Sequence, residues 1–514
     1  MLARVPALLL AAASLLPGEH RPGFDTITEK DVAADLHALA SAPLEGRDSP
    51  SVGLTRAGDY IIGRFQAAGL EGAGEGGAFR LPWGRNLPAP RAEGCQLVLE
   101  VEGEEPLTFE LARDFVPLVD CNGAAEGKPV FCGFGISSKK EKYDDLKGVA
   151  LKGCVAVILD GEPRHARKFE GELVTPEADV HVKLRHLAAA GAEAVVIVQR
   201  PPADQPKDLD PPALAFRHTW ATWNVTANQR DPEVPRSLEL AVVEVTPDVA
   251  SKILGADVLA MAAGLDVTAR PDSGKPRDAL LKVSSATEER SVPIDNIGGI
   301  VRGSDPALSG EYVVVGAHYD HVGVGVRGQI GYGADDNASG TTAMLEVVQA
   351  LAAAHPRRSI LACAFSGEED GLLGSRALVD KPPVPLDRVV AMLNLDMIGR
   401  GDPGLVVVLG TENSSDMARV LDRAEKQAKT KTKAVTGKGL HLWERSDHYS
   451  FYQAGVPVLF FFEAESELDN KDYHTWRDTV DLLDTDKIAR TARLTYNAAW
   501  ILAEDDERPA RARD

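Results

Sequence analysis

Acidic and imidazole side chains are concentrated in one stretch of the chain, VVVGAHYDHVGVGVRGQIGYGADDNASG, residues 313–340. It holds His318, Asp320, Asp335 and Asp336 between a run of valines and a helix-like segment. Carboxylates and imidazoles gathered at the end of a buried strand repel and desolvate one another unless a cation compensates them. The stretch therefore indicates a metal site.

Further candidate ligands follow later hydrophobic runs. Glu368 and Glu369 follow ILACAFSG, Asp396 follows VVAMLNL, and His474 lies in DYHTWRDT, beyond VPVLFFFE. Loops at one edge of a sheet could bring these side chains together. Two imidazoles with three carboxylates suit zinc or a similar divalent ion, and a shared carboxylate is what a two-metal site needs.

The segments HxDH, GADDNASG, FSGEEDGLLGS, NLDMIGR and YHTWRDT, in this order, resemble the co-catalytic zinc aminopeptidases of the M28 metallopeptidase family. The resemblance covers residues 280–480, and LEGR near the N-terminus is also similar. It implies two zinc ions per chain: His318 and Asp396 on one, Glu369 and His474 on the other, and Asp336 bridging both.

The same resemblance assigns the remaining polar groups. Glu368 matches the general base that deprotonates a water bridging the two ions, and Asp320 matches the acid that orients His318. Asp335 is expected to be structural or to support the metal ligands from behind. Tyr473 matches an oxyanion donor of some members, and a packing role for it is equally open; the loop that carries the donor in other members has Trp443 here.

The residue types support this chemistry independently. Adjacent glutamates in an extended loop point in different directions, so one can bind an ion while the other faces the attacking water.

Ser446, Asp447 and His448 contain the letters of a serine triad, but consecutive side chains cannot form its relay. His321 and Glu463 could line the substrate site. Arg47, in a loop rich in Gly, Pro and Ser, is expected to be a solvated charge.

Strands and helices alternate from Ile297 onward, which predicts an α/β fold with a mostly parallel sheet flanked by helices. Helices are expected over 340–354, 415–429 and 486–502. Ligands in such sheets bind beyond the carboxyl ends of the strands, where the candidate donors fall.

Four segments are expected: a signal peptide over 1–18, the N-terminal part of the catalytic domain over 19–89, a β-rich insert over 90–280, and the main catalytic domain over 281–514. The insert resembles a protease-associated (PA) domain and shows no His, Asp and Glu cluster at ligand spacing. Its histidines are expected at the surface or satisfied by neighbours: His165, His181, His186 and His218. We expect it to cover or restrict the catalytic site.

Composition bounds the partners and the location. With 56 basic and 77 acidic residues among 514, the net charge of -21 argues against nucleic acid and anionic membranes as partners. The N-terminal apolar run is too short for a comfortable membrane span and resembles a secretory signal, which predicts a secreted or periplasmic protein with no stable membrane insertion. Of five cysteines, Cys121 and Cys132 are the nearest pair for a disulfide, and Cys363 is expected in the core.

These observations favour an exported two-zinc aminopeptidase acting on peptides or small proteins. A carboxypeptidase or dipeptidase of the same family would need cations for a free carboxylate, and Arg327, Arg400 and Arg445 are candidates. A single-zinc glutaminyl-cyclase-like enzyme and a non-catalytic, receptor-like binding protein are further alternatives. Retention of all five ligand positions and Glu368 counts against the last.

Overall fold

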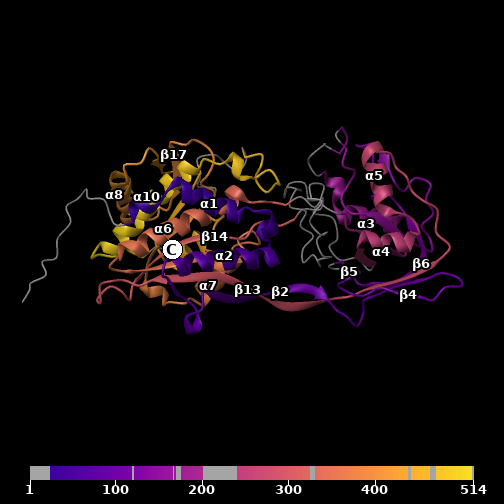
Figure 1. Ribbon diagram of the computed structural model, residues 1–514, viewed down its shortest axis with the longest axis horizontal. Coiled ribbons are helices and arrows are strands. Elements are labelled where there is room, and N and C mark those ends of the chain that lie inside the picture. The colour runs from indigo at the N-terminus through magenta and orange to yellow at the C-terminus, as the bar shows by residue number, and fades with distance from the viewer. Residues whose placement is uncertain are drawn as a thin grey trace, which may run out of the picture.

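Two large β-sheets, each with its own core, dominate the structure. The computed structural model describes residues 23–118, 121–165, 167–169, 175–200, 240–324, 330–437, 442–463 and 470–511. The predicted signal peptide, His218 and Arg327 lie outside these ranges. A long antiparallel ribbon of β2 (Arg80–Pro90) and β13 (Thr287–Val301) runs from one sheet to the other (Figure 1).

The first sheet has nine strands in the order β1-β13-β15-β14-β16-β19-β17-β18, with β2 also paired to β13. Its centre is parallel, because β14 pairs in parallel with β15 and β16, and β16 with β19. These strands are continuous apolar runs buried on both faces. The predicted fold class is therefore confirmed. The strand bounds are β1 (Glu71–Gly72), β14 (Tyr312–His318), β15 (Ser359–Phe365), β16 (Val389–Leu395), β17 (Leu405–Leu409), β18 (Lys433–Val435) and β19 (Val458–Phe462).

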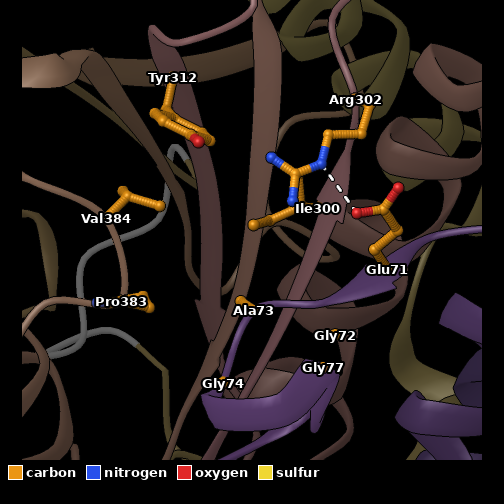
Figure 2. A pocket seen from close by; sticks show the side chains of 10 residues that line it. All are labelled: Glu71, Gly72, Ala73, Gly74, Gly77, Ile300, Arg302, Tyr312, Pro383 and Val384. Atoms are coloured by element: carbon orange, nitrogen blue, oxygen red, sulfur yellow. Dashed lines mark hydrogen bonds and ion pairs between the residues drawn. The ribbon is translucent and has the colours of Figure 1, made fainter.

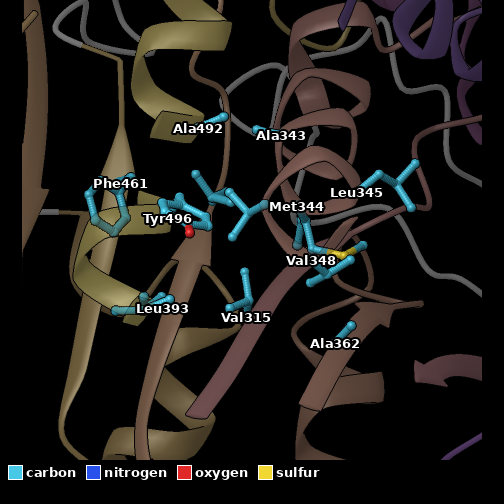
Figure 3. Packing of buried hydrophobic residues seen from close by; sticks show 14 of the residues in the cluster. Val315, Ala343, Met344, Leu345, Val348, Ala362, Leu393, Phe461, Ala492 and Tyr496 are labelled. Carbon is cyan, nitrogen blue, oxygen red and sulfur yellow. The ribbon is translucent and has the colours of Figure 1, made fainter. Parts of the chain in front are cut away.

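Helices cover both faces of this sheet. Val313 and Val315 point into the larger core and Val314 into the smaller one, as the alternation of a strand requires. Figure 3 shows the larger core between α6, α10 and the central strands. The larger core is built on α1 (Glu29–Leu39), α2 (Val52–Ala67), α6 (Gly340–Ala354), α8 (Ser415–Ala428) and α10 (Thr485–Glu504), and the smaller on α7 (Leu373–Asp380) and α9 (His448–Gln453).

Local sequence explains where most of these helices begin. Thr28, Ser51, Ser414 and Asp484 each accept a backbone N–H at the start of their helix. The helix α6 has no such side-chain cap and instead follows directly on the turn 334–339, which carries Asp335 and Asp336. The three helices expected from the sequence all form, with ends within two residues of those predicted.

The second sheet has eight strands in the order β4-β3-β12-β6-β9-β10-β11-β5. Its faces are covered by separate apolar clusters and by α3 (Val180–Ala189), α4 (Pro247–Leu254) and α5 (Val258–Thr268). Its strands are β3 (Gln96–Glu100), β4 (Leu107–Thr108), β5 (Phe115–Pro117), β6 (Gly123–Phe131), β9 (Cys154–Leu159), β10 (Ala194–Val198), β11 (Ala241–Val245) and β12 (Leu280–Ser285), beside the short hairpin of β7 (Ser137–Ser138) and β8 (Tyr143–Asp144).

None of the five cysteines forms a disulfide in the described structure, so the disulfide considered for Cys121 and Cys132 does not form. Both side chains instead pack in an apolar cluster of the second sheet, where a thiol behaves as a small hydrophobic group. Cys363 is fully buried in β15, as expected. No helix in the described ranges is long and apolar enough to cross a bilayer.

Candidate metal centre

The carboxyl ends of the central strands hold the predicted donors. His318 is the last residue of β14, Glu369 lies in the loop after β15, and Asp396 directly follows β16. The turn before α6 supplies Asp336, and the chain between β19 and α10 supplies His474. Parallel strands end at one edge, so donors distant in sequence meet there. They form two groups with donor atoms within 4.8 Å of one another: His318, Asp336 and Asp396; and His321, Asp336, Glu369 and His474.

Asp336 belongs to both groups and faces each with a different oxygen. In the first group, His318 Nε2 lies 3.4 Å from Asp336 Oδ1 and 3.3 Å from Asp396 Oδ1. In the second, His474 Nε2 lies 3.0 Å from Asp336 Oδ2 and 2.9 Å from Glu369 Oε2. A carboxylate that presents one oxygen to each of two donor groups has the arrangement of a bridging ligand.

The donor set fits metal ions better than it fits hydrogen bonds alone. His474 Nε2 is close to two carboxylates, yet it makes no hydrogen bond of acceptable geometry within the described part of the chain. Burial would lower the pKa of His474, but Glu369 and Asp336 raise it well above its ordinary value. Burial would likewise lower the pKa of His318, but Asp396 raises it, and the pKa lies well above its ordinary value. The site therefore attracts positive charge, and its imidazole and carboxylate donors suit zinc.

Asp320 connects the first donor group to the glutamate loop. His318 Nδ1 lies 3.6 Å from Asp320 Oδ1 and 3.3 Å from its backbone oxygen. The carboxylate also accepts the Ser49 hydroxyl and the Glu368 N–H, each at 3.3 Å. Asp320 therefore lies where it could orient His318, and this role stays a prediction.

Ser446 also lies beside the first donor group. Its hydroxyl donates to Asp396 Oδ2 at 2.7 Å and accepts the Asn394 side-chain amide at 2.7 Å. The His448 ring instead stacks on Phe460 with centroids 4.2 Å apart. Ser446 thus supports Asp396. Ser446, Asp447 and His448 do not form a serine relay.

Glu368 lines a small pocket next to the first donor group, together with His318, Asp336 and Asp396. Burial raises the pKa of Glu368 well above its ordinary value; His318 opposes this shift, and Glu369 and Asp396 add to it. The other described lining residues are mainly apolar: Met397, Leu442, Phe460, Phe462, Tyr473 and Arg445. Tyr473 also stacks on His474, with ring centroids 3.9 Å apart, so it both packs and borders the pocket.

Residues 296–499 match the family model described as "Peptidase family M28". This region belongs to peptidase family M28. A "Probable leucine aminopeptidase" of Arthroderma otae is 34% identical over 209 residues, which are 40% of this chain and 57% of that protein. A "Probable glutamate carboxypeptidase VP8" of Zea mays is 27% identical over 92% of this chain and 63% of that protein. The chain thus spans less than two thirds of these curated relatives.

One match among solved structures is "The structure of BSAP, a zinc aminopeptidase from Bacillus subtilis". It is 19% identical, covers 95% of this chain and 97% of its own, and has a TM-score of 0.48.

Two acids near the M28 donor groups serve the scaffold. Asp335 accepts the Gly399 N–H at 2.8 Å, and Glu463 accepts the Arg400 N–H at 3.0 Å. Burial raises the pKa of both carboxyls, and each acid also shifts the pKa of the other. Asp335 therefore has a position consistent with the structural role expected of it. Glu463 was expected to border the substrate site, but it lies with Asp335, outside the described pocket lining.

Arg47 corrects one expectation from the sequence, since its guanidinium is buried and not solvated. It donates to the carbonyls of Tyr319 at 2.8 Å, Tyr332 at 2.9 Å and Gly333 at 2.9 Å, and also to Leu39. Burial lowers its pKa to about 10, while the site carboxylates oppose this shift. Several donors in a fixed fork suit this task, because they join two parts of the 313–340 stretch to each other and to the end of α1.

The ribbon holds the glutamate loop of the M28 domain from both sides. Trp83 Nε1 donates to Ser366 Oγ at 3.0 Å, and Arg85 forms an ion pair with Asp370. From the partner strand, Asn296 Oδ1 accepts the Ser366 N–H at 3.0 Å. Glu368 and Glu369 lie between these anchor points. Neither Trp83 nor Arg85 carries a sequence signal for this role.

A second hollow lies at the opposite ends of the strands (Figure 2). It is bordered by Tyr312, the first residue of β14, and by Arg302, whose guanidinium bonds Glu71 at 2.8 Å. His318 is the last residue of the same strand. None of the candidate donors lies among the described residues that line this hollow.

Proposed function

We propose that the protein is a two-zinc aminopeptidase that removes N-terminal residues from peptides. The observation that carries this is the convergence of two donor groups on a shared Asp336, with Glu368 beside them in a pocket. The names of the relatives from Arthroderma otae and of "Aminopeptidase YwaD" of Bacillus subtilis support it.

The residues proposed to hold the ions are His318, Asp336, Asp396, Glu369 and His474. Zinc bound there would polarise the scissile carbonyl and acidify a water. Glu368 takes the proton from the attacking water and later delivers it to the leaving amine. Its raised pKa suits a group that must hold a proton between these two events. Asp320 keeps both His318 and the Glu368 backbone in place.

The pocket supports an apolar terminal side chain. Met397, Leu442, Phe460 and Phe462 supply apolar surface next to Asp396 and Glu368. Contact of an apolar side chain with this surface contributes roughly 25 cal/mol for each Å² of apolar surface removed from water. We therefore propose leucine-like or aromatic N-terminal residues as substrates, and Tyr473 as a donor to the developing oxyanion.

A carboxypeptidase is the second candidate, because Arg445 lines the same pocket. Of the other arginines considered for a substrate carboxylate, Arg400 pairs with Asp472 at 3.0 Å, and Arg327 lies outside the described residues. The name of the Zea mays relative points the same way.

A panel of N-blocked and C-blocked peptides, assayed with chelator and after zinc addition, separates these candidates. An aminopeptidase cleaves C-blocked peptides and spares N-blocked ones, and zinc restores the activity that the chelator removes. The reverse selectivity would replace the aminopeptidase proposal with the carboxypeptidase. Absence of both zinc and hydrolysis would refute an enzyme of either kind.

We also propose that residues 90–280 form a PA-like domain that restricts access to the site, and that residues 1–18 direct export. Deletion of 90–280 should change the preferred substrate length more than the turnover of a dipeptide. Unchanged length preference in a folded variant would refute the restricting role. N-terminal sequencing of the exported protein tests the signal: a mature chain that still starts at Met1 contradicts cleavage.

A further inference from the structure

The two donor groups contain different numbers of protein ligands. Three residues form the group around His318, whereas four form the group around His474. The additional residue is His321, for which the family resemblance implied no ligand role. Its side chain is fully buried.

His321 faces the same two carboxylates as His474. Its Nδ1 lies 2.8 Å from Glu369 Oε1 and 3.6 Å from Asp336 Oδ2. His474 Nε2 lies 2.9 Å from the other oxygen of Glu369, Oε2, and 3.0 Å from Asp336 Oδ2. Zinc bonds of 2.0–2.1 Å in a tetrahedron place neighbouring donor atoms about 3.3 Å apart. The four separations bracket this value, and one donor atom from each of the four residues lies within 4.8 Å of the others, so these donors can bind one ion together.

The orientation of His321 is fixed by its surroundings. Its backbone N–H donates to the Arg47 carbonyl at 3.1 Å. Its ring packs against Gly333, where a Cβ atom would lie 2.5 Å from the ring and where φ is +56°. Glycine at this position leaves room for the imidazole to reach the carboxylates.

The pocket opens on the other donor group. It is bordered by His318, Asp336 and Asp396, and none of His321, Glu369 and His474 is among its described lining residues. In protein zinc sites, four protein ligands usually close the coordination shell, whereas three leave a position for water or substrate. The number of ligands and the place of the pocket therefore lead to the same assignment.

We propose that His321 is a zinc ligand and that the two metal positions are unequal, an inference that rests on the proposed function. The closed position is held by Asp336, Glu369, His474 and His321, and it binds zinc more tightly. The open position is held by His318, Asp336 and Asp396, exchanges zinc more readily, and is the one that receives the substrate carbonyl.

Zinc titration of chelator-stripped protein against a chromophoric competitor tests the assignment without an activity assay. Wild type should bind two ions in two resolved steps, at least about tenfold apart in affinity. Asp396→Asn should weaken the second step and spare the first. His321→Ala should weaken the first step beyond the roughly 10- to 100-fold that loss of a hydrogen bond to a ligand costs.

His321→Asn decides between a ligand and a mere hydrogen-bond donor. Asparagine keeps an N–H near the position of Nδ1 but is a poor zinc ligand. If His321 binds zinc, His321→Asn behaves as His321→Ala, and both change the visible spectrum of the first cobalt(II) ion bound. Recovery of wild-type affinity in His321→Asn would overturn the proposal.

His448→Asn is the matched control, because His448 is equally buried but stacks on Phe460 and belongs to neither donor group. Both zinc steps should persist in it. Circular dichroism of each metal-free variant checks folding, and a misfolded His321→Ala leaves His321→Asn to decide. Two equal zinc steps in wild type, or loss of the first step in Asp396→Asn, would refute the inequality alone. Absence of zinc binding in wild type would refute the proposed function itself.

Discussion

Buried charged groups have different kinds of partner in the two sheets of this protein. In the second sheet, buried groups find protein partners: Lys183 donates to the carbonyls of Leu159 and Gly161, and Arg200 pairs with Asp266 at 3.1 Å. In the M28 sheet, His318, Asp336, Asp396, Glu369 and His474 meet at one edge. The ion-pair partners of Asp336 among the described residues are histidines, and no described lysine or arginine pairs with it.

The difference shows how a functional edge can be recognised. Parallel strands ending together occur in both sheets, so topology alone does not distinguish them. Isolated buried charges are costly, and a cluster of acids with imidazoles persists where a metal ion supplies the balancing charge. Binding or removing metal should therefore affect the first sheet and leave the second largely unchanged.

Glu368→Gln should give the largest effect on the M28 edge. Loss of a general base costs about 10²–10⁴-fold in turnover, and both zinc ions should remain, because Glu368 belongs to neither donor group. Turnover and metal content are measured on the same preparation. Concurrent loss of metal would make Glu368 a ligand and exchange its proposed role with that of Glu369.

His474→Ala should reduce metal occupancy and with it the stability of the M28 sheet. Ligand binding at a thousandfold excess over Kd contributes about 4 kcal/mol to folding, so loss of one ion removes an effect of this order. Hydrogen exchange measured with and without chelator should show the change in β14–β16 and not in β9–β11. Equal changes in both sheets would contradict the prediction that metal stabilises only the M28 sheet.

Acid should destabilise the M28 sheet through His448, whose pKa burial lowers to about 3. The unfolded state binds the proton near pH 6.5, so the native state loses stability as pH falls from about 6.5 to 3, by a few kcal/mol in order of magnitude. Denaturant titrations at pH 7 and pH 5 measure this loss. His448→Asn should flatten it, and an unchanged slope would remove His448 as the cause.

The second sheet should respond at the other end of the pH range. Burial lowers the pKa of Lys183 to about 8, although Asp160 and Glu162 oppose the shift. Between about pH 8 and the ordinary lysine pKa, the unfolded state binds more protons, so stability rises with pH. Lys183→Met should abolish this rise, and its persistence would show that another group causes it.

Arg85→Ala should give the smallest effect, since it loosens the glutamate loop without touching a donor. An ion pair about one-fifth exposed contributes roughly 1 kcal/mol, which predicts up to about a fivefold loss of kcat with KM and metal content unchanged. Arg80→Ala is the matched control, because Arg80 lies on the same strand but pairs with Asp59 and Asp295. Equal losses in both variants would mean that the ribbon acts only through general stability.

Much of the M28 domain was predictable from the chain alone. The apolar runs of β14, β15 and β16 and the helix periodicity after them are local properties, and they predicted a mostly parallel sheet with donors at its carboxyl edge. The order of the motifs predicted which side chains would meet. Asp335 and Asp336 were also separable by motif, although they are adjacent.

The roles of residues whose partners are distant in sequence could not be predicted from local sequence patterns. Arg47 looked like a solvated loop charge, because the carbonyls that surround it come from Leu39, Tyr319, Tyr332 and Gly333. Glu463 likewise lies near Asp335, which is far from it in sequence.

The sequence by itself determined the donor types, their order and the strands that carry them, because these depend on side-chain chemistry and on short-range periodicity. The tertiary structure alone decided that His321 joins the His474 group, that the pocket opens on the His318 side, and that the ribbon holds the glutamate loop. Each of these depends on separations of a few ångströms between segments that are remote in the chain, and such separations are set by packing of the whole domain.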